Sequence, residues 1–297
     1  MNKKIALIND MKRYDRMAYL DSVSIISTFG DKAYIDVEEN KSYDAFISGY
    51  IEDSDKILHL REFIGDAKLD RPHTLYLCDP VFGDDGKIYE NITDKHIENF
   101  KKLMEVSDII TPNFTEALIL TNESYEENRE KFNIIKYEND SKEKIDKLSR
   151  KIIESIFPIL DKILFKKNQI TIITGIELYN AVLTILDVYD GDHGKRQTTC
   201  NYSEKVESRD GAGDIFDAMF FETSTNGFGL VDALSATTSF INNSLRYSRD
   251  KKIDKNLGIF FEPILFENVM VMRNKLIEKN KKINENKNMN DNKNKGE

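Results

Sequence analysis

The chain contains few of the residues that build disulfide frameworks or zinc sites. Only two cysteines, Cys78 and Cys200, occur among its 297 residues, which excludes a disulfide framework. Cys78 follows an apolar run and is expected to be a small core residue. Four histidines are present, and none has the His-x-x-His or Glu-x-x-His spacing that would favour a zinc enzyme.

Long hydrophobic runs are also missing. No stretch of 18 apolar residues occurs, so no transmembrane helix is expected. The apolar run near the start, residues 5–8, is too short for the core of a signal peptide, and we expect a cytoplasmic protein.

The balance of charge is acidic. With 43 basic and 52 acidic residues, the net charge is −9, which argues against nucleic acid or an anionic membrane as a partner. A small anionic ligand remains compatible with this charge, because such a ligand needs only a local site.

The length and the distribution of polar residues suggest one large folded unit with a tail. We expect a domain over residues 1–278. The last 19 residues, 279–297, contain six lysines and seven asparagines and are predicted to be a disordered tail, because they can bury little apolar surface. The polar segment 123–147 is predicted to be a surface insertion or a solvated helix.

The rest of the chain alternates between short apolar runs and segments with helical spacing, which predicts a mostly parallel sheet with helices on both faces. The predicted strands are residues 4–9, 33–37, 45–48, 74–78, 109–110, 169–174 and 181–188. The predicted helices are residues 17–29, 56–64, 94–106, 115–120, 145–164, 214–221 and 231–245. Ligands in such folds bind beyond the carboxyl ends of the strands, where Asn9-Asp10, Asp79, Thr111–Asn113 and Thr174-Gly175 lie.

The most informative motif is the run from Arg209 to Phe216. Its small residues 211–213 allow close approach of a ligand, and the apolar pattern that follows predicts a helix whose first N–H groups form an anion site. Asp214 lies beside those N–H groups, where a carboxylate could accept the proton of an attacking hydroxyl during phosphoryl transfer. The alternative is an ordinary capped helix after a glycine turn.

Three further motifs end predicted strands. Asp79 opens an acidic, Pro- and Gly-containing loop that suits hydrated Mg²⁺, although an Asp-rich surface turn reads equally well. Asn113 and Glu116 are three residues apart and can face one side of a helix start, or form a helix cap. Thr174, in the run Ile-Ile-Thr-Gly, ends a strand that could touch a nucleotide.

Together, the order Asp-Pro-Val-x-Gly-Asp, Thr-Pro-Asn-x-x-Glu-Ala, Ile-Thr-Gly and Asp-Gly-x-Gly-Asp resembles the pyridoxal/pyridoxamine kinases of the ribokinase-like superfamily. The opening Ile-Ala-Leu-Ile-Asn-Asp is similar to that of the family's bacterial pyridoxamine kinase branch. The resemblance covers most of residues 1–278. It implies a three-layer α/β sandwich and ATP-dependent phosphorylation of the 5′-hydroxymethyl group of a B6 vitamer.

The resemblance also implies roles for individual residues. Asp214 would be the catalytic base, with the anion hole formed by the backbone of Gly211, Ala212 and Gly213. Asp79, Asn113 and Glu116 would position Mg²⁺ and the phosphates, with Asp79 and Glu116 as the metal positions, and Thr174 would touch an ATP phosphate. The substrate side would include Asn9, Asp10 and Tyr89, although Tyr89 also reads as an ordinary half-buried aromatic. A monovalent cation and a homodimer are further candidates.

Two segments depart from the family pattern. The loop Met11–Arg16 has bulky and charged residues where the family has a Ser/Gly-rich loop. Only twelve residues separate Gly30 from Tyr43, whereas family members carry a longer segment there with a lid-like strand and helix. Two alternatives therefore stay open: a kinase of the same fold with another acceptor, such as a hydroxymethylpyrimidine, and a nucleotide-binding pseudoenzyme.

Overall fold

The structure, a computed structural model, describes residues 2–10, 18–38, 40–139, 141–272, 274 and 278. The loop Met11–Arg16 and the predicted tail 279–297 lie outside the described residues. The strands are β1 (Lys4–Ile8), β2 (Lys32–Tyr34), β3 (Ala45–Ser48), β4 (Leu75–Cys78), β5 (Gly83–Asp84), β6 (Lys87–Ile88), β7 (Ile109–Ile110), β8 (Ile170–Glu177), β9 (Ala181–Asp190) and β10 (Lys195–Glu204).

The helices are α1 (Ala18–Phe29), α2 (Ser54–Asp70), α3 (Asp94–Met104), α4 (Phe114–Thr121), α5 (Tyr125–Asn133), α6 (Lys142–Lys162), α7 (Ala212–Thr225) and α8 (Leu230–Asp250), with a short 3₁₀ turn at Lys255–Leu257. Residues 262–272 are also helical. None of the helices in these described ranges is long and apolar enough to span a membrane.

The strands of the described chain form one large sheet and one small hairpin. The large sheet has eight strands in the order β10-β9-β8-β7-β4-β3-β1-β2, and β5 pairs with β6. The pairs from β2 to β8 are parallel, whereas β8–β9 and β9–β10 are antiparallel. The predicted mostly parallel α/β sheet is thus confirmed.

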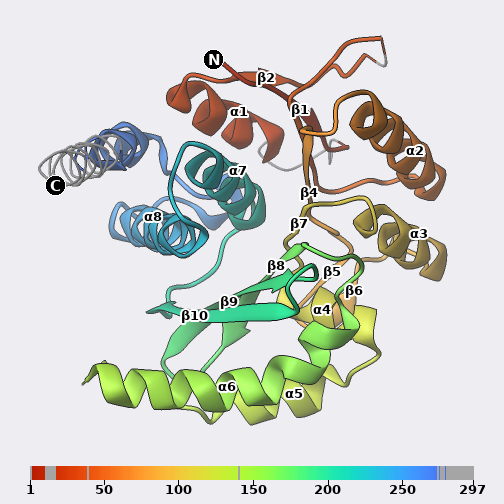
Figure 1. The fold of residues 1–297 in the computed structure, drawn as a ribbon. Helices are drawn as coiled ribbons and strands as arrows, with labels where there is room; N and C mark the ends of the chain where they lie inside the picture. Colours follow the sequence, from red (N-terminus) through yellow and green to blue (C-terminus); the bar gives the residue numbers. More distant parts are fainter. Residues whose placement is uncertain are drawn as a thin grey trace, which may run out of the picture.

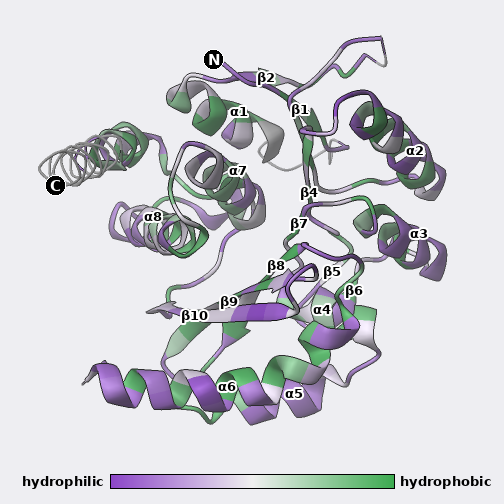
Figure 2. Ribbon diagram, viewed as in Figure 1, coloured by the Kyte–Doolittle hydropathy of each residue, from purple (hydrophilic) through white to green (hydrophobic). Residues whose placement is uncertain are grey.

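Both faces of the sheet are covered by helices, as Figure 1 shows, with α1, α7 and α8 on one face and α2 and α3 on the other. The strand sequences fit this arrangement because successive side chains point to opposite faces. Ile5 and Leu7 of β1 pack with α1, α7 and α8, whereas Ala6 between them packs with the other face. In Figure 2 the helices are hydrophilic mainly on their outer surfaces, as expected for an outer layer.

The structure differs from the sequence prediction at β8, at β10 and at the β5–β6 hairpin. The strand predicted to stop at Gly175 continues as β8 to Glu177, because Gly175 adopts a φ of +74° and the register shifts between Ile173 and Ile176. Such a bulge needs the conformational freedom of glycine. The strand β10 and the β5–β6 hairpin were not predicted, because their sequences are mostly polar and lack an apolar alternation.

We expect Ile64→Ala in α2 to destabilise the protein by about 2–5 kcal/mol, because truncating a buried aliphatic side chain leaves a cavity. Ile64 is 0% exposed. Leu69→Ala in the same helix is the control, since Leu69 is 80% exposed, and it should change the unfolding free energy by less than about 0.5 kcal/mol. Chemical denaturation measures both variants, and equal effects would contradict the described packing of α2.

Candidate active site

One cleft gathers every site residue predicted from the sequence. It has a volume of about 950 Å³ and lies where the parallel strands end. Its lining includes all eleven predicted residues: Asn9, Asp10, Asp79, Tyr89, Asn113, Glu116, Thr174, Gly211, Ala212, Gly213 and Asp214. Residues more than 200 positions apart in the sequence therefore share one cleft, whose size suits a small-molecule ligand.

The ladder of backbone hydrogen bonds continues past the strands and fixes the residues that follow them. The N–H of Asp79 donates to the carbonyl of Ser48 at 2.9 Å, and the N–H of Thr111 donates to Cys78 at 3.1 Å. The N–H of Thr174 donates to Pro112 at 3.1 Å. The strand ends therefore hold their polar side chains on a rigid frame.

The helix α7 begins at this edge of the sheet. Gly211 is its N-cap residue with a φ of +84°, a conformation that favours glycine. The first N–H groups of a helix have no partner within the helix, so the backbone of residues 211–213 offers donors to an anion. Asp214 lies in the first turn, as predicted.

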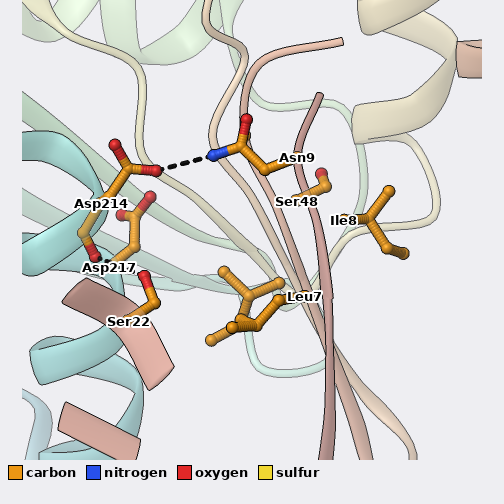
Figure 3. A pocket seen from close by; sticks show the side chains of 9 residues that line it. Leu7, Ile8, Asn9, Ser22, Ser48, Asp214 and Asp217 are labelled. Carbon is orange, nitrogen blue, oxygen red and sulfur yellow. Dashed lines mark hydrogen bonds between the residues drawn. The ribbon is translucent and has the colours of Figure 1, made fainter. Parts of the chain in front are cut away.

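The side chain of Asp214 contacts the end of β1. Asn9 Nδ2 donates to Asp214 Oδ1 at 2.9 Å, and Ser22 Oγ donates to the backbone carbonyl of Asp214 at 3.3 Å. Figure 3 shows Asp214 and Asp217 on one side of a small cavity and Asn9 and Ser48 on the other. This cavity has a volume of about 10 Å³, which is about the space for one water molecule.

Three buried carboxyl groups line the same cleft as Asp214. Burial raises the pKa of Asp79, Glu116 and Asp217 well above the usual range, and charge repulsion adds to this effect. For Asp79 the repelling group is Asp214, and for Glu116 and Asp217 it is Asp79. A cation at this place would relieve the repulsion, because it stabilises the charged carboxylates.

Asn113 and Glu116 form a capping box at the start of α4. Glu116 Oε1 accepts from the N–H groups of Phe82 and Gly83 at 3.0 and 3.4 Å, and Oε2 accepts from the N–H of Asn113 at 2.8 Å. Asn113 Nδ2 donates to the carbonyl of Gly83 at 2.8 Å. The pair therefore holds the loop before the β5–β6 hairpin against α4. This capping box is the helix-cap alternative named in the sequence analysis.

The remaining predicted residues lie at different parts of the cleft. Asp10 accepts from the N–H of Glu52 at 2.9 Å and from Lys56 Nζ at 3.0 Å, so its carboxylate holds the loop before α2. Tyr89 is half-buried against the core and lines the cleft, and burial raises the pKa of its hydroxyl. Thr174 forms a bridge to Asn113, next to the bulge of β8.

The charge of the cleft is strongly acidic. Among the described residues, twelve acidic and three basic side chains line it. One of the basic groups, Arg209, donates to the backbone carbonyls of residues 253, 254 and 258 and so holds a loop. A polyphosphate would therefore need cations to enter.

The residues present fit a magnesium ion that is held mainly by phosphate and water. Among the described residues, no group of three or more His, Cys, Asp or Glu is arranged to hold a metal ion. Mg²⁺ commonly uses only one or two carboxylates and keeps several waters. Asp79 is suited to that role, whereas three N–H groups already occupy most of the four acceptor positions of Glu116.

Sequence reasoning missed Asp217, which is 3% exposed and lines both the cleft and the small cavity. The available signal was a carboxylate three residues after Asp214, within an apolar helix. It also missed a face of α8 that lines the cleft, although its i, i+3, i+4, i+7 spacing can be seen in the sequence. This face consists of Thr238, Ile241, Asn242 and Leu245.

Comparison with solved structures identifies the class of fold. A Bacteroides thetaiotaomicron protein described as a phosphomethylpyrimidine kinase, crystallised with pyridoxal, has a TM-score of 0.69 over 90% of this chain and 96% of its own, at 22% identity. Pyridoxal kinase from Leishmania donovani, in complex with ADP and ginkgotoxin, has a TM-score of 0.68 over 90% and 96%, at 13% identity. The chain therefore shares the fold of these two solved proteins.

Comparison of sequences finds relatives among proteins named as pyridoxal kinases. A Schizosaccharomyces pombe protein named as a pyridoxal kinase is 28% identical over 179 residues, which span 60% of this chain and 45% of that protein. The matched segments cover less than half the length of the curated relatives. No protein-family model matches the chain. The matched segments are thus similar to proteins named as pyridoxal kinases, which agrees with the resemblance stated above.

We expect Glu116→Gln to destabilise the protein by about 1–3 kcal/mol, because its amide nitrogen cannot accept a hydrogen bond and at least one buried N–H loses its acceptor. Thermal and chemical denaturation measure the effect. The control is Glu126→Gln on the exposed side of α5, which should leave stability unchanged. A Glu116→Gln protein as stable as the wild type would show that these N–H groups do not depend on the carboxylate.

Proposed function

We propose that the protein transfers the γ-phosphoryl group of ATP to the 5′-hydroxymethyl group of a B6 vitamer. The observation that carries this proposal is the start of α7. Its glycine-shaped N-terminus and Asp214 face the ends of β1 and β4 within one cleft. An anion site and a carboxylate base are thereby side by side, as phosphoryl transfer requires.

The nucleotide would extend from the start of α7 toward α8. The N–H groups of residues 211–213 would face the transferred phosphoryl group, and Thr174 would contact a phosphate. The adenine would lie against the mixed apolar and polar face of α8 that lines the far end of the cleft. The lining of the cleft also includes the buried Val206, which follows β10 and adds apolar surface for a flat ring.

Magnesium would neutralise the phosphates in a cleft with few basic side chains. Asp79 would hold the ion, with Asn113 and Glu116 fixing the neighbouring loop. When bound, Mg²⁺ supplies charge stabilisation to the phosphoryl group. This assignment explains why the buried carboxylates gather at this edge, since a cation would offset their mutual repulsion.

The reaction balances with Asp214 as the only proton acceptor needed. The acceptor O–H bond breaks and its proton passes to the Asp214 carboxylate. The oxygen then bonds to the γ-phosphorus, while the bond from that phosphorus to the bridging oxygen of ADP breaks. The acceptor would lie near Asn9, Asp10 and Tyr89, on the β1 side of Asp214.

A second candidate acceptor is a hydroxymethylpyrimidine. The structural neighbour described as a phosphomethylpyrimidine kinase favours it, and that same protein was crystallised with pyridoxal. Both acceptors are flat heteroaromatic rings with a hydroxymethyl group, so the same base and anion site serve either. Direct assay separates them.

The test measures phosphoryl transfer from Mg-ATP to pyridoxal, pyridoxamine, pyridoxine and a hydroxymethylpyrimidine. We expect a phosphorylated vitamer and, in Asp214→Asn, a rate about 10²–10⁴-fold lower, because a positioned base contributes about that factor. Calorimetry should show nearly unchanged ATP affinity in the variant, because the N–H donors remain. Near-wild-type turnover in Asp214→Asn would remove the base assignment. Binding of ATP without transfer to any acceptor would favour the pseudoenzyme alternative.

A further inference from the structure

Asn9 forms a hydrogen bond with Asp214, which suggests a role other than direct contact with the acceptor. Asn9 Nδ2 lies 2.9 Å from Asp214 Oδ1, and the two residues are 205 positions apart (Figure 3). Asn9 directly follows β1. The N–H of its neighbour Asp10 donates to Tyr50 at 2.8 Å, so the backbone beside the amide is fixed.

Gly49, at the end of β3, leaves space for this contact. A methyl group at Gly49 would lie 3.1 Å from Asn9 Nδ2 and 3.6 Å from Asp214 Oδ1. The backbone at Gly49 is not in the left-handed region, so its conformation does not require glycine. The close approach of the Asn9 amide is therefore what a larger side chain would disturb.

The carboxylate of Asp214 needs a hydrogen-bond donor to fix its orientation, because acidic groups lie around it. Its neighbours Asp79 and Asp217 are buried carboxyl groups that repel it. Ser22 Oγ donates to the backbone carbonyl of Asp214 at 3.3 Å. The amide of Asn9 is an N–H donor to one carboxylate oxygen, and such a bond restricts rotation of the carboxylate plane.

We propose that Asn9 is a positioning residue that orients the Asp214 carboxylate for proton transfer. The inference rests on the proposed function and adds Asn9 as the residue that orients the proposed base, Asp214. Asn9 then contributes to the rate through Asp214, and contributes little to the affinity for either substrate. Gly49 leaves the space that the Asn9 amide needs to reach Asp214.

The first test compares variants of the Asn9–Asp214 contact. We expect Asn9→Ala to lower kcat about 10–100-fold with nearly unchanged KM values, because small misplacement of a reacting group has effects of this size. Asn9→Asp keeps the shape but replaces the donor with a repelling charge, so its kcat should be at least as low. Gly49→Ala should lower kcat less than Asn9→Ala does, because it crowds the amide of Asn9 without removing it. The control is Asn180→Ala, since Asn180 Nδ2 donates a hydrogen bond of 2.8 Å to the backbone carbonyl of Tyr137, and neither residue lines the cleft.

The second test asks whether Asn9 acts through Asp214. In the Asp214→Asn background, adding Asn9→Ala should change kcat less than about twofold, because residues that act as a unit are non-additive. Two results would overturn the inference. One is a raised KM for the acceptor with unchanged kcat, which would make Asn9 an acceptor contact. The other is an equal loss of kcat in both backgrounds.

A third measurement separates this inference from the proposed function. The side-chain amide signals of Asn9 are recorded by NMR in the wild type and in Asp214→Ala, with the Asn180 amide signals as reference. We expect the Asn9 signals to move and the Asn180 signals to stay. If the wild type phosphorylates none of the vitamers, the proposed function fails, but moved Asn9 signals still support the contact. Unmoved Asn9 signals overturn the inference whatever the acceptor.

Discussion

The cleft depends on how β1 and α7 are joined at both ends. At the carboxyl end of β1, Asn9 donates to Asp214. At the other end, Lys3 Nζ lies 3.6 Å from the buried Glu222 of α7 and also pairs with Asp31. Burial raises the pKa of Glu222 to about 8, so this end is held by a lysine beside a desolvated acid. Because these partners are about 200 residues apart, the site forms only when the sheet is complete.

This arrangement also explains the charge of the cleft. Parallel strands place their polar ends at one edge, and here the described lining has twelve acidic and only three basic side chains. The start of α7 offers only partial positive charge, about half an elementary charge from the helix dipole. Under the proposed function, a nucleotide polyphosphate would therefore have to bring its own cation into this acidic cleft.

The sequence predicted the parts of the fold that local patterns determine. Apolar runs located seven strands, and the small residues before Asp214 located the start of α7 within two residues. The bulge at Gly175 and the strand β10 were missed, because both depend on pairing with β9 rather than on local composition. Asp217 was missed for a related reason. Its importance comes from its proximity to Asp79, which no spacing in the sequence reveals.

The two ends of the cleft are built under different constraints. The proposed phosphoryl transfer would need fixed donors and a fixed base, and a helix terminus and strand ends are rigid enough to supply them. The acceptor end relies on loops, since Asp10 holds the segment before α2 and Tyr50 pairs with Asn91. One of the two segments that depart from the family pattern, Met11–Arg16, directly follows Asp10 in the sequence. Loops can change without moving α7, so the acceptor can differ among related proteins while the reaction stays the same.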